Sequence, residues 1–360
     1  GFAIAANAAT EVYASGSLGQ GNRTAWTIYD DGLLVIDGKG NTMTSVNWDS
    51  TTASPWKSYA DIITRISFTN CENWTSLPAH SFKSLRNLKE IALPENLEVI
   101  QELALGYTGI ETIVLPQSLK EIGRAAFSNC EALNYVNIHS GITKIDSDAF
   151  SNCVNLKAIS IPDSVTSIGQ TLFQNCRNLE YVRLSESVDK IGGSMFSGCT
   201  MLKNISLPSS VTTIGSKAFF KASNLASIYY HGVSEPTTYN PGLENATFSL
   251  APDTMVIYAS NNYSGTTMGL KKNWENDVQT VTKIDGYFVN VAHTVGGAVK
   301  VDKSIVSASD TVTVDIMSYK NFALDTFVVK GTDGNAIAVN GDGNTRTFAM
   351  PAGDVTITAT

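Results

Sequence analysis

Apolar residues recur along the middle of the chain with steps of 22 or 23 residues, from about residue 61 to about residue 231. The aromatic series is Phe82, Leu105, Phe127, Phe150, Phe173, Phe196 and Phe219. A second series is Leu88, Ile110, Leu133, Leu156, Leu179, Leu202 and Leu225. A third series is Leu77, Ile100, Ile122, Ile145, Ile168, Ile191 and Ile214. Three series in one register predict a repeat protein, in which neighbouring units bury a continuous core.

Within each repeat the spacing of apolar residues predicts the local structure. Ile159 and Ile161 alternate with polar residues, which indicates a strand with one buried face. Pro162 should end that strand because it has no N–H for the ladder. A second short extended segment follows. Phe173 and Cys176, three residues apart, are then expected on one face of a single α or 3₁₀ turn.

The repeats need protection at both ends. Residues 23–38 predict a β-hairpin, with the turn at Asp30, Asp31 and Gly32, and Trp48 and Trp56 are expected to cover the first repeat. Residues 233–284 lose the period and predict a terminating repeat with a closing helix or loop; they contain Pro236, Pro241, Pro252, the run 255–258 and Trp274. The expected domains are therefore a tail and cap at 1–60, repeats at 61–232, a second cap and linker at 233–284, and a last domain at 285–360.

The last domain has a different pattern. Alternating apolar residues, such as Val289 and Val291 or Val312 and Val314, predict several strands, with Gly-containing turns between them. This indicates a small all-β module. Asp333, Asn335, Asp342 and Asn344 invite comparison with a calcium site, but their spacing favours hairpin turns.

The repeats resemble those of BspA-like bacterial surface proteins, whose signature is I-P-x-S-V-T-x-I-G-x-x-A-F-x-x-C-x-x-L. The hairpin and a "P-W" segment resemble the start of such arrays. The resemblance implies a β-rich α/β solenoid, a right-handed leucine-rich-repeat superhelix with a parallel sheet and short helical turns. Two departures predict local irregularity: the unit at 106–109 has Leu105 for Phe and Thr108 for Cys and is one residue short, and His139 and Ser185 replace the strand-ending proline.

The C-terminal module resembles bacterial surface repeats related to the internalin B-repeat. The matching segments are G-G-x-V-x-V-D-K at 296–303 and F-x-M-P-A-G-D-V-T-I-T-A at 348–359. Whether the module is β-grasp-like or an immunoglobulin-like sandwich stays open at this point.

Charge narrows the class of partner. The net charge is −8, only 16% of residues are charged, and no cluster of Lys and Arg offsets this, which argues against nucleic acid and anionic membranes. No stretch has the roughly 18–20 apolar residues that span a bilayer. Residues 1–8 fit either the end of a secretory signal, with an A-x-A site at 6–8, or a flexible alanine-rich terminus.

Catalytic and metal chemistry find little support. Cys130, Cys153, Cys176 and Cys199 recur every 23 residues without a C-x-x-C or paired histidines, which favours a buried ladder of small side chains; disulfides between neighbouring repeats stay open. Cys71 lies outside the ladder and is expected to be free. Glu90 and Glu111 lie on neighbouring strands, but no enclosed pocket is predicted for a glycosidase pair. We therefore expect no enzyme, no metal and no cofactor.

Binding is the remaining class of function. Side chains that flank the strand isoleucines point away from the core, and aromatic residues and arginine are the usual hot spots of interfaces. The candidate partner-binding residues are Tyr135, His139, Tyr181, Arg183, Tyr229 and His231. We expect an exported or cell-surface monomer that binds a protein or carbohydrate ligand outside the cell. The resemblance to BspA-like proteins implies the adhesion and host-interaction class. The alternatives are a structural spacer in a surface assembly and, ranked last, a hydrolase with an unrecognised site.

Overall fold

The computed structural model describes residues 10–18, 24–41, 48, 53–238, 255–271, 278–320 and 322–360. The chain forms two compact units. The N-terminal unit is Gly1–Leu156 with Ser167–Cys176, and the C-terminal unit is Lys157–Thr166 with Arg177–Thr360. The signal-like segment 1–8, Pro241, Pro252 and Trp274 lie outside the described residues.

The N-terminal unit begins with the predicted hairpin. Strands β2 (Thr24–Tyr29) and β3 (Leu33–Asp37) pair antiparallel, with Trp26 opposite Ile36. A further strand, β1 (Val12–Leu18), pairs with β2 and was not predicted. Strand β3 then runs parallel to β4 (Arg65–Thr69), so the hairpin continues into the repeats. Trp56 is fully buried and stacks on Phe82, the first aromatic residue of the repeat series, with ring centroids 5.4 Å apart. The expected cover of the first repeat is confirmed.

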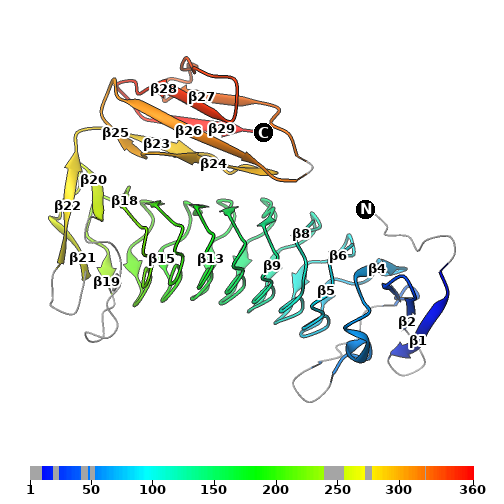
Figure 1. The fold of residues 1–360 in the computed structure, drawn as a ribbon. Coiled ribbons are helices and arrows are strands. Elements are labelled where there is room, and N and C mark those ends of the chain that lie inside the picture. Colours follow the sequence, from blue (N-terminus) through cyan, green and yellow to red (C-terminus); the bar gives the residue numbers. More distant parts are fainter. Residues whose placement is uncertain are drawn as a thin grey trace. The chain divides into compact units, whose positions relative to one another are not determined.

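Each repeat contributes two short strands, which we call its first and second strand (Figure 1). In the N-terminal unit the first strands after β4 are β6 (Glu90–Ile91), β8 (Thr112–Ile113) and β10 (Tyr135–Val136). The second strands are β5 (Ser76–Leu77), β7 (Val99–Ile100), β9 (Glu121–Ile122), β11 (Lys144–Ile145) and β13 (Ser167–Ile168). Paired strands are parallel and in register, as in Ile122 opposite Ile145 opposite Ile168. The predicted leucine-rich-repeat fold of parallel strands is confirmed, while the right-handed solenoid stays a prediction.

The C-terminal unit continues the same scheme. Its first strands are β12 (Ala158–Ser160), β14 (Tyr181–Arg183), β16 (Asn204–Leu207) and β18 (Ser227–Tyr230). Its second strands are β15 (Lys190–Ile191), β17 (Thr213–Ile214) and β19 (Thr237–Thr238). Beyond β18 come β20 (Val256–Ser260), β21 (Thr267–Lys271) and β22 (Val278–Ile284). Strands β18, β20 and β22 pair in parallel. The described residues of 233–284 extend this sheet, connected by loops, and contain no helix.

The predicted apolar series form the core of each unit. Phe127 and Phe150 stack with ring centroids 5.5 Å apart, and Phe150 and Phe173 with centroids 6.0 Å apart. In the C-terminal unit Phe196 stacks on Phe219 at 5.4 Å. All five rings are completely buried. Burial of one such side chain stabilises the fold by roughly 1.5–3 kcal/mol, so the aromatic series is a major source of stability.

The expected helical turn around the aromatic series is wrong. Within the described residues the only helix is the 3₁₀ turn Lys57–Tyr59. Asp148 and Asn152 have φ of 60° and 58°, and equivalent residues in other repeats also have positive φ. Residues in this left-handed region cannot be part of a right-handed helix. The N–H of Phe150 instead donates to the carbonyl of Leu172 in the next repeat, at 3.1 Å. Alternate residues of this segment therefore bond between repeats, as strands do.

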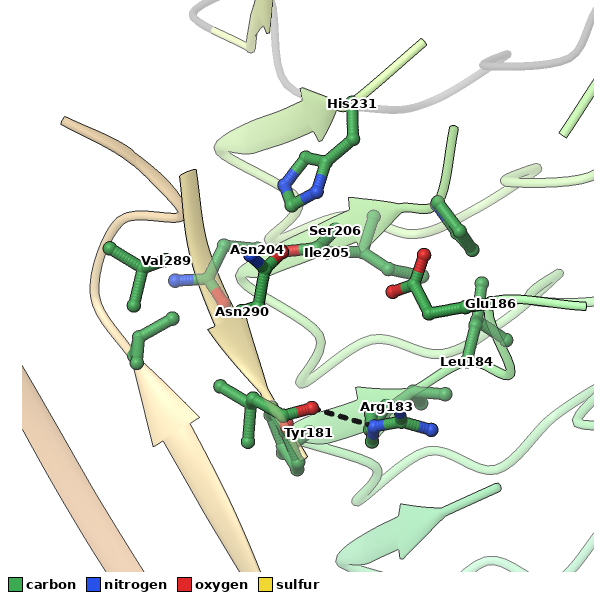
Figure 2. A pocket seen from close by; sticks show the side chains of 14 residues that line it. Tyr181, Arg183, Leu184, Glu186, Asn204, Ile205, Ser206, His231, Val289 and Asn290 are labelled. Atoms are coloured by element: carbon green, nitrogen blue, oxygen red, sulfur yellow. Dashed lines mark hydrogen bonds between the residues drawn. The ribbon is translucent and has the colours of Figure 1, made fainter. Parts of the chain in front are cut away.

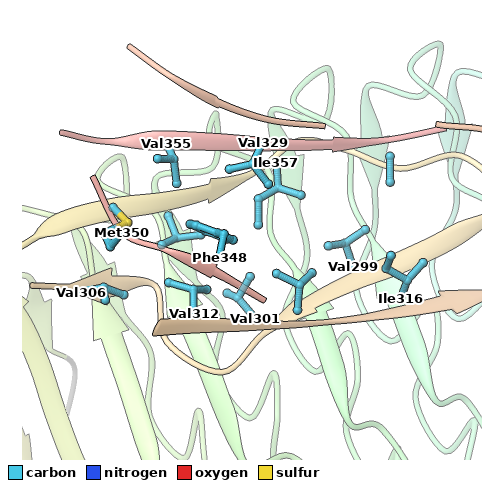
Figure 3. Close-up of a cluster of buried hydrophobic side chains, with 13 residues drawn as sticks. Val299, Val301, Val306, Val312, Ile316, Val329, Phe348, Met350, Val355 and Ile357 are labelled. Carbon is cyan, nitrogen blue, oxygen red and sulfur yellow. The ribbon is translucent and has the colours of Figure 1, made fainter. Parts of the chain in front are cut away.

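The C-terminal module is a two-layer β-sandwich. One sheet holds β25 (Ile305–Val306), β23 (Tyr287–Val291), β29 (Val355–Ala359) and β27 (Phe327–Gly331), and the other holds β24 (Gly297–Val301), β26 (Thr311–Ser318) and β28 (Thr345–Ala349). Figure 3 shows the apolar side chains that fill the space between the layers, with Phe348 among them. The expected all-β module is observed, and no helix is present in its described residues.

Candidate functional site

The predicted binding residues lie on or just after the first strands, and those of the N-terminal unit differ in exposure. The side chain of Tyr135 is partly buried on β10, opposite Thr112 of β8. Val114, which follows β8, has 72% of its surface exposed. It is the most exposed apolar side chain that the structure records next to Thr112 and Tyr135.

His139, also in the N-terminal unit, is buried and has a structural role. Its Nε2 lies 2.8 Å from the carbonyl oxygen of Pro116, and its Nδ1 accepts a hydrogen bond from the N–H of Gly141 at 3.1 Å. Because Nδ1 accepts, Nε2 carries the proton and donates to Pro116. The ring thus provides hydrogen-bond partners for the carbonyl of Pro116 and the N–H of Gly141, at the position where other repeats have the strand-ending proline.

Arg183 is the most highly connected residue of the predicted set, and its side chain is buried. Its Nε donates to the carbonyl oxygen of Val291 in the C-terminal module at 2.7 Å. Its Nη1 donates to the carbonyl oxygen of Ile161 at 2.6 Å. Its Nη2 lies 2.9 Å from each carboxylate oxygen of Asp163. A planar guanidinium can make this set of bonds, whereas an ammonium cannot match its geometry.

Two more predicted residues of the C-terminal unit, Tyr229 and His231, contact the module, and a third, Tyr181, is buried. The Tyr229 hydroxyl lies 3.4 Å from the carbonyl oxygen of Asp302, and burial raises the pKa of Tyr229 to about 12. The Nε2 of His231 lies 3.0 Å from the hydroxyl of Ser304, and its ring centroid is 4.6 Å from that of Phe288. Burial lowers the pKa of His231 to about 4. Tyr181 is buried, and this raises the pKa of its hydroxyl.

The full contact also includes residues that the sequence did not indicate. The repeats contribute Ser160, whose hydroxyl is 2.9 Å from Nδ1 of His293, and Ser206, which donates to Ser304 at 2.8 Å. Small hydroxyl residues give no signal in a search for aromatic or charged hot spots. The module residues could not be paired with the repeats because no pattern links positions about 100 residues apart.

A small hollow lies where β23 passes the repeats (Figure 2). Arg183, Glu186, Asn204, Ser206, His231 and Asn290 contribute its polar lining. Its volume is about 40 Å³, which is room for a water molecule or two and not for a substrate. Three of the six predicted residues, Arg183, Tyr229 and His231, therefore serve an internal contact in this structure, and Tyr181 lines the hollow beside them. The exposure expected of the predicted set is not found for Tyr181, Arg183, Tyr229 and His139.

The cysteine ladder is a set of buried hydrogen-bonded thiols. The five cysteines are buried and none of them forms a disulfide. Sγ of Cys153 donates to the carbonyl of Phe127 at 3.2 Å, and Sγ of Cys176 to that of Phe150 at 3.1 Å. Burial raises the pKa of Cys130 to about 11 and that of Cys176 to about 12. Such thiols are poor nucleophiles and poor metal ligands because both roles need the thiolate.

Other candidate chemistry is weak in the part of the chain that the structure describes. No group of three or more His, Cys, Asp or Glu side chains is arranged to hold a metal ion there. Glu90 and Glu111 are both exposed. Nor does any helix of these residues have the length and apolar character to cross a bilayer.

Comparison with known proteins assigns the repeats. The family described as the BspA type leucine rich repeat region matches residues 57–134 and 120–235, with six copies. Among curated proteins, none matches this chain. The module lies beyond the matched residues, so its resemblance to internalin-related repeats stays a prediction.

Three solved structures are similar in fold. A leucine-rich cell surface protein of Faecalibacterium prausnitzii A2-165 is 20% identical, with a TM-score of 0.37 over 69% of this chain and 95% of that one. A leucine-rich-repeat protein of Bacteroides ovatus ATCC 8483 is 16% identical, with a TM-score of 0.49 over 76% of each chain. The leucine-rich-repeat protein of T. pallidum is 24% identical, with a TM-score of 0.39 over 51% of this chain and 90% of that one. At these TM-scores the likenesses carry no inference about function.

Proposed function

The chain belongs to the BspA-type leucine-rich-repeat proteins, and from that premise we propose that it acts at the cell exterior as a non-catalytic binding protein. Its partner is a protein or a glycan, held on the first-strand face of the N-terminal unit. This proposal belongs to the adhesion and host-interaction class that the resemblance to BspA-like proteins implies.

The exposure of Val114 is the observation that carries this proposal. Val114 is 72% exposed and continues the strand β8, and Tyr135 and Asn137 from the next repeat are only partly buried. In the C-terminal unit the positions equivalent to Tyr135 and Asn137 are Tyr181 and Arg183, which are buried under the module. The same face is thus used for a contact in one unit and offers apolar surface in the other.

The polar frame around Val114 suits specific recognition. An apolar side chain surrounded by amide, hydroxyl and carboxylate groups matches the make-up of interfaces, which have an apolar centre and a polar rim. Thr112, which precedes Val114 by two residues, supplies a hydroxyl, and Tyr135, which pairs with Thr112, supplies an aromatic ring with a polar tip. The partner is expected to place an apolar group over Val114.

The test is a binding screen of the full chain against extracellular-matrix proteins and glycans, repeated with Val114→Asp. We expect the wild type to retain at least one partner. Val114→Asp should bind that partner about tenfold or more weakly, because the introduced carboxylate would be desolvated at the contact. Val233→Asp is the matched control, since Val233 is a valine of the C-terminal unit that is 59% exposed. Equal loss in both variants, or none in either, would refute the proposed face.

A structural spacer is the second candidate, and the Arg183 contacts favour it. The buried guanidinium holds the module to its own repeats. A module fixed in this way is suited to act as a rigid spacer rather than to bind a ligand. If the folded full chain retains no partner in the screen, the spacer function is favoured.

A further inference from the structure

One repeat is shorter than the others, and the shortening is confined to one place. Between its core positions 108 and 110 lies a single residue, Gly109, where the preceding repeat has two residues at 86–87 and the following repeat has two at 131–132. The backbone bonds on both sides keep the usual register: the N–H of Ser84 donates to Gly106 at 2.9 Å, and the N–H of Tyr107 donates to Ser128 at 2.8 Å. The missing residue is therefore not absorbed by a shift of the neighbours.

The short segment runs close against the preceding repeat. A Cβ atom on Gly109 would lie 2.2 Å from the carbonyl oxygen of Arg86, so no larger residue fits without a shift of the backbone. A hollow of about 250 Å³ lies at this short segment. Its main lining residues are Arg86, Lys89, Tyr107, Gly109, Asn129 and Glu131.

The charges around this hollow are predominantly positive. Arg86 and Lys89 are exposed, and in the described part of the chain neither forms an ion pair. The Nζ of Lys83 lies 5.9 Å from the ring centroid of Tyr107 and adds a third cation at the edge. Glu131 is the single carboxylate of the lining. Arg86, Lys89 and Lys83 therefore give this hollow a local positive charge although the chain as a whole has a net charge of −8.

We propose that the hollow at the short repeat binds one acidic sugar residue of a glycan, a hexuronic acid or a related carboxylated sugar. The fork of Arg86 is suited to bidentate binding of the sugar carboxylate, with Lys89 as a second positive charge. The Tyr107 ring offers an apolar surface to the sugar ring. Asn129 and Glu131 offer an amide and a carboxylate to the sugar hydroxyls.

The size and the lining favour a sugar over an acidic peptide. Pockets for drug-sized ligands hold roughly 300–1,000 Å³, so about 250 Å³ suits a single ring. An acidic peptide has a side-chain carboxylate for Arg86, but it would have to satisfy Glu131 with a backbone N–H, whereas a sugar offers several hydroxyls around its ring. The site lies on the turn between the aromatic segment and the first strand, and it therefore goes beyond the first-strand face proposed above.

The direct test is a titration of the full chain with glucuronic acid, followed by ligand-observed NMR. We expect weak saturable binding, with a Kd of about 1 mM as is usual for small ligands held by few contacts. Glucose, which lacks the carboxylate, should bind at least about tenfold more weakly, because the charged hydrogen bonds are lost. Tetraglutamate and sulfate serve as the other anions. Equal binding of either with the same dependence on Arg86 would overturn the proposal in favour of a general anion site.

Two variants and one control locate the site. Arg86→Gln should weaken glucuronic acid binding about tenfold. Arg177→Gln should have no effect, because Arg177 holds the same place in a repeat that is followed by one of full length. Insertion of one alanine between Gly109 and Ile110 restores the standard length and should remove binding, with an unchanged circular dichroism spectrum. Binding that survives both Arg86→Gln and the insertion would refute the site. Because Val114→Asp should leave this binding intact, the two proposals can fail separately.

Discussion

The guanidinium of Arg183 and the backbone carbonyl of Val291 are joined by a hydrogen bond of 2.7 Å between positions more than 100 residues apart in the chain. Arg183 belongs to strand β14 of the repeats, and Val291 ends strand β23 of the module. The bond therefore fixes the module to its own repeats within the C-terminal unit. Removal of this bond, with the charge retained, should loosen that contact.

Arg183→Lys is the substitution that makes this change. We expect a loss of about 2 kcal/mol in the free energy of unfolding, because a lysine cannot replace the guanidinium bonds to Val291, Ile161 and Asp163. Urea denaturation measures the loss, and faster amide exchange at 289–291 would locate it. Arg177→Lys, at an exposed arginine, is the matched control. Identical denaturation midpoints for the two variants would show that the guanidinium geometry is unimportant.

His231 should make the C-terminal unit sensitive to acid. Burial lowers its pKa from 6.5 to about 4, so between these pH values the unfolded chain binds a proton that the folded chain does not. The free energy of unfolding should therefore fall as the pH drops from 6.5 towards 4, by at most about 1.4 kcal/mol per pH unit. Urea denaturation at pH 7 and pH 5 tests this. The same drop in His231→Gln would assign the effect to other groups.

The cysteine ladder should resist alkylation in the folded protein. Burial raises the pKa of Cys130 to about 11 and of Cys176 to about 12. At pH 8 only about one Cys130 thiol in a thousand would be ionised, so iodoacetamide should modify these residues only after denaturation. Mass spectrometry of peptides from native and denatured samples gives the extent of labelling. Rapid labelling of native Cys176 would contradict the burial.

The same thiols predict a loss of stability in alkali. The pKa values of these thiols in the folded protein lie above the ordinary value of 9.0. Their contribution to the free energy of unfolding is therefore complete below pH 9 and is lost as the pH rises towards 11 and 12. The unfolded chain releases these protons first, and each thiol then costs about 1.4 kcal/mol per pH unit. Thermal melts between pH 8 and pH 10.5 measure the effect. A Cys153→Ala variant, with one thiol fewer, should show a shallower decline.

Gly169 tests the close approach of neighbouring repeats. A Cβ atom there would lie 2.0 Å from the backbone nitrogen of Ser147, so Gly169→Ala should cost about 2–3 kcal/mol through overpacking. Gly343→Ala is the control, because no atom lies within 4 Å of the corresponding Cβ position. The midpoint of urea denaturation should fall only for Gly169→Ala. A neutral result there would mean that the strands can separate without cost.

The repeat fold could be predicted because its apolar series is periodic. The register of Ile122, Ile145 and Ile168 follows directly from their spacing, and so does the stacking of Phe127 on Phe150. The helical turn was wrong because a spacing of three fits both a helix and a segment with residues such as Asp148 in the left-handed region. Side-chain periodicity carries no information about the sign of φ.

The candidate site was harder to predict, and the reason is physical. The outward direction of Arg183 and Tyr229 followed from strand alternation. Their burial depends on the module, and neither the repeat pattern nor the pattern of the module indicates where the two are in contact. The hollow at Gly109 arises from a missing residue, which the sequence showed only as an irregular repeat.

Backbone hydrogen bonds join adjacent repeats at every second residue of the aromatic segment. These bonds affect how the sequences of such chains can diversify. Because Phe127 bonds to Ala149 and Ser84 bonds to Gly106 through the backbone, the alignment of adjacent units does not depend on the identity of the side chains between them. A deletion such as the one before Ile110 is then corrected within a few residues. New recognition features can therefore arise by indels in one unit while the others keep their structure.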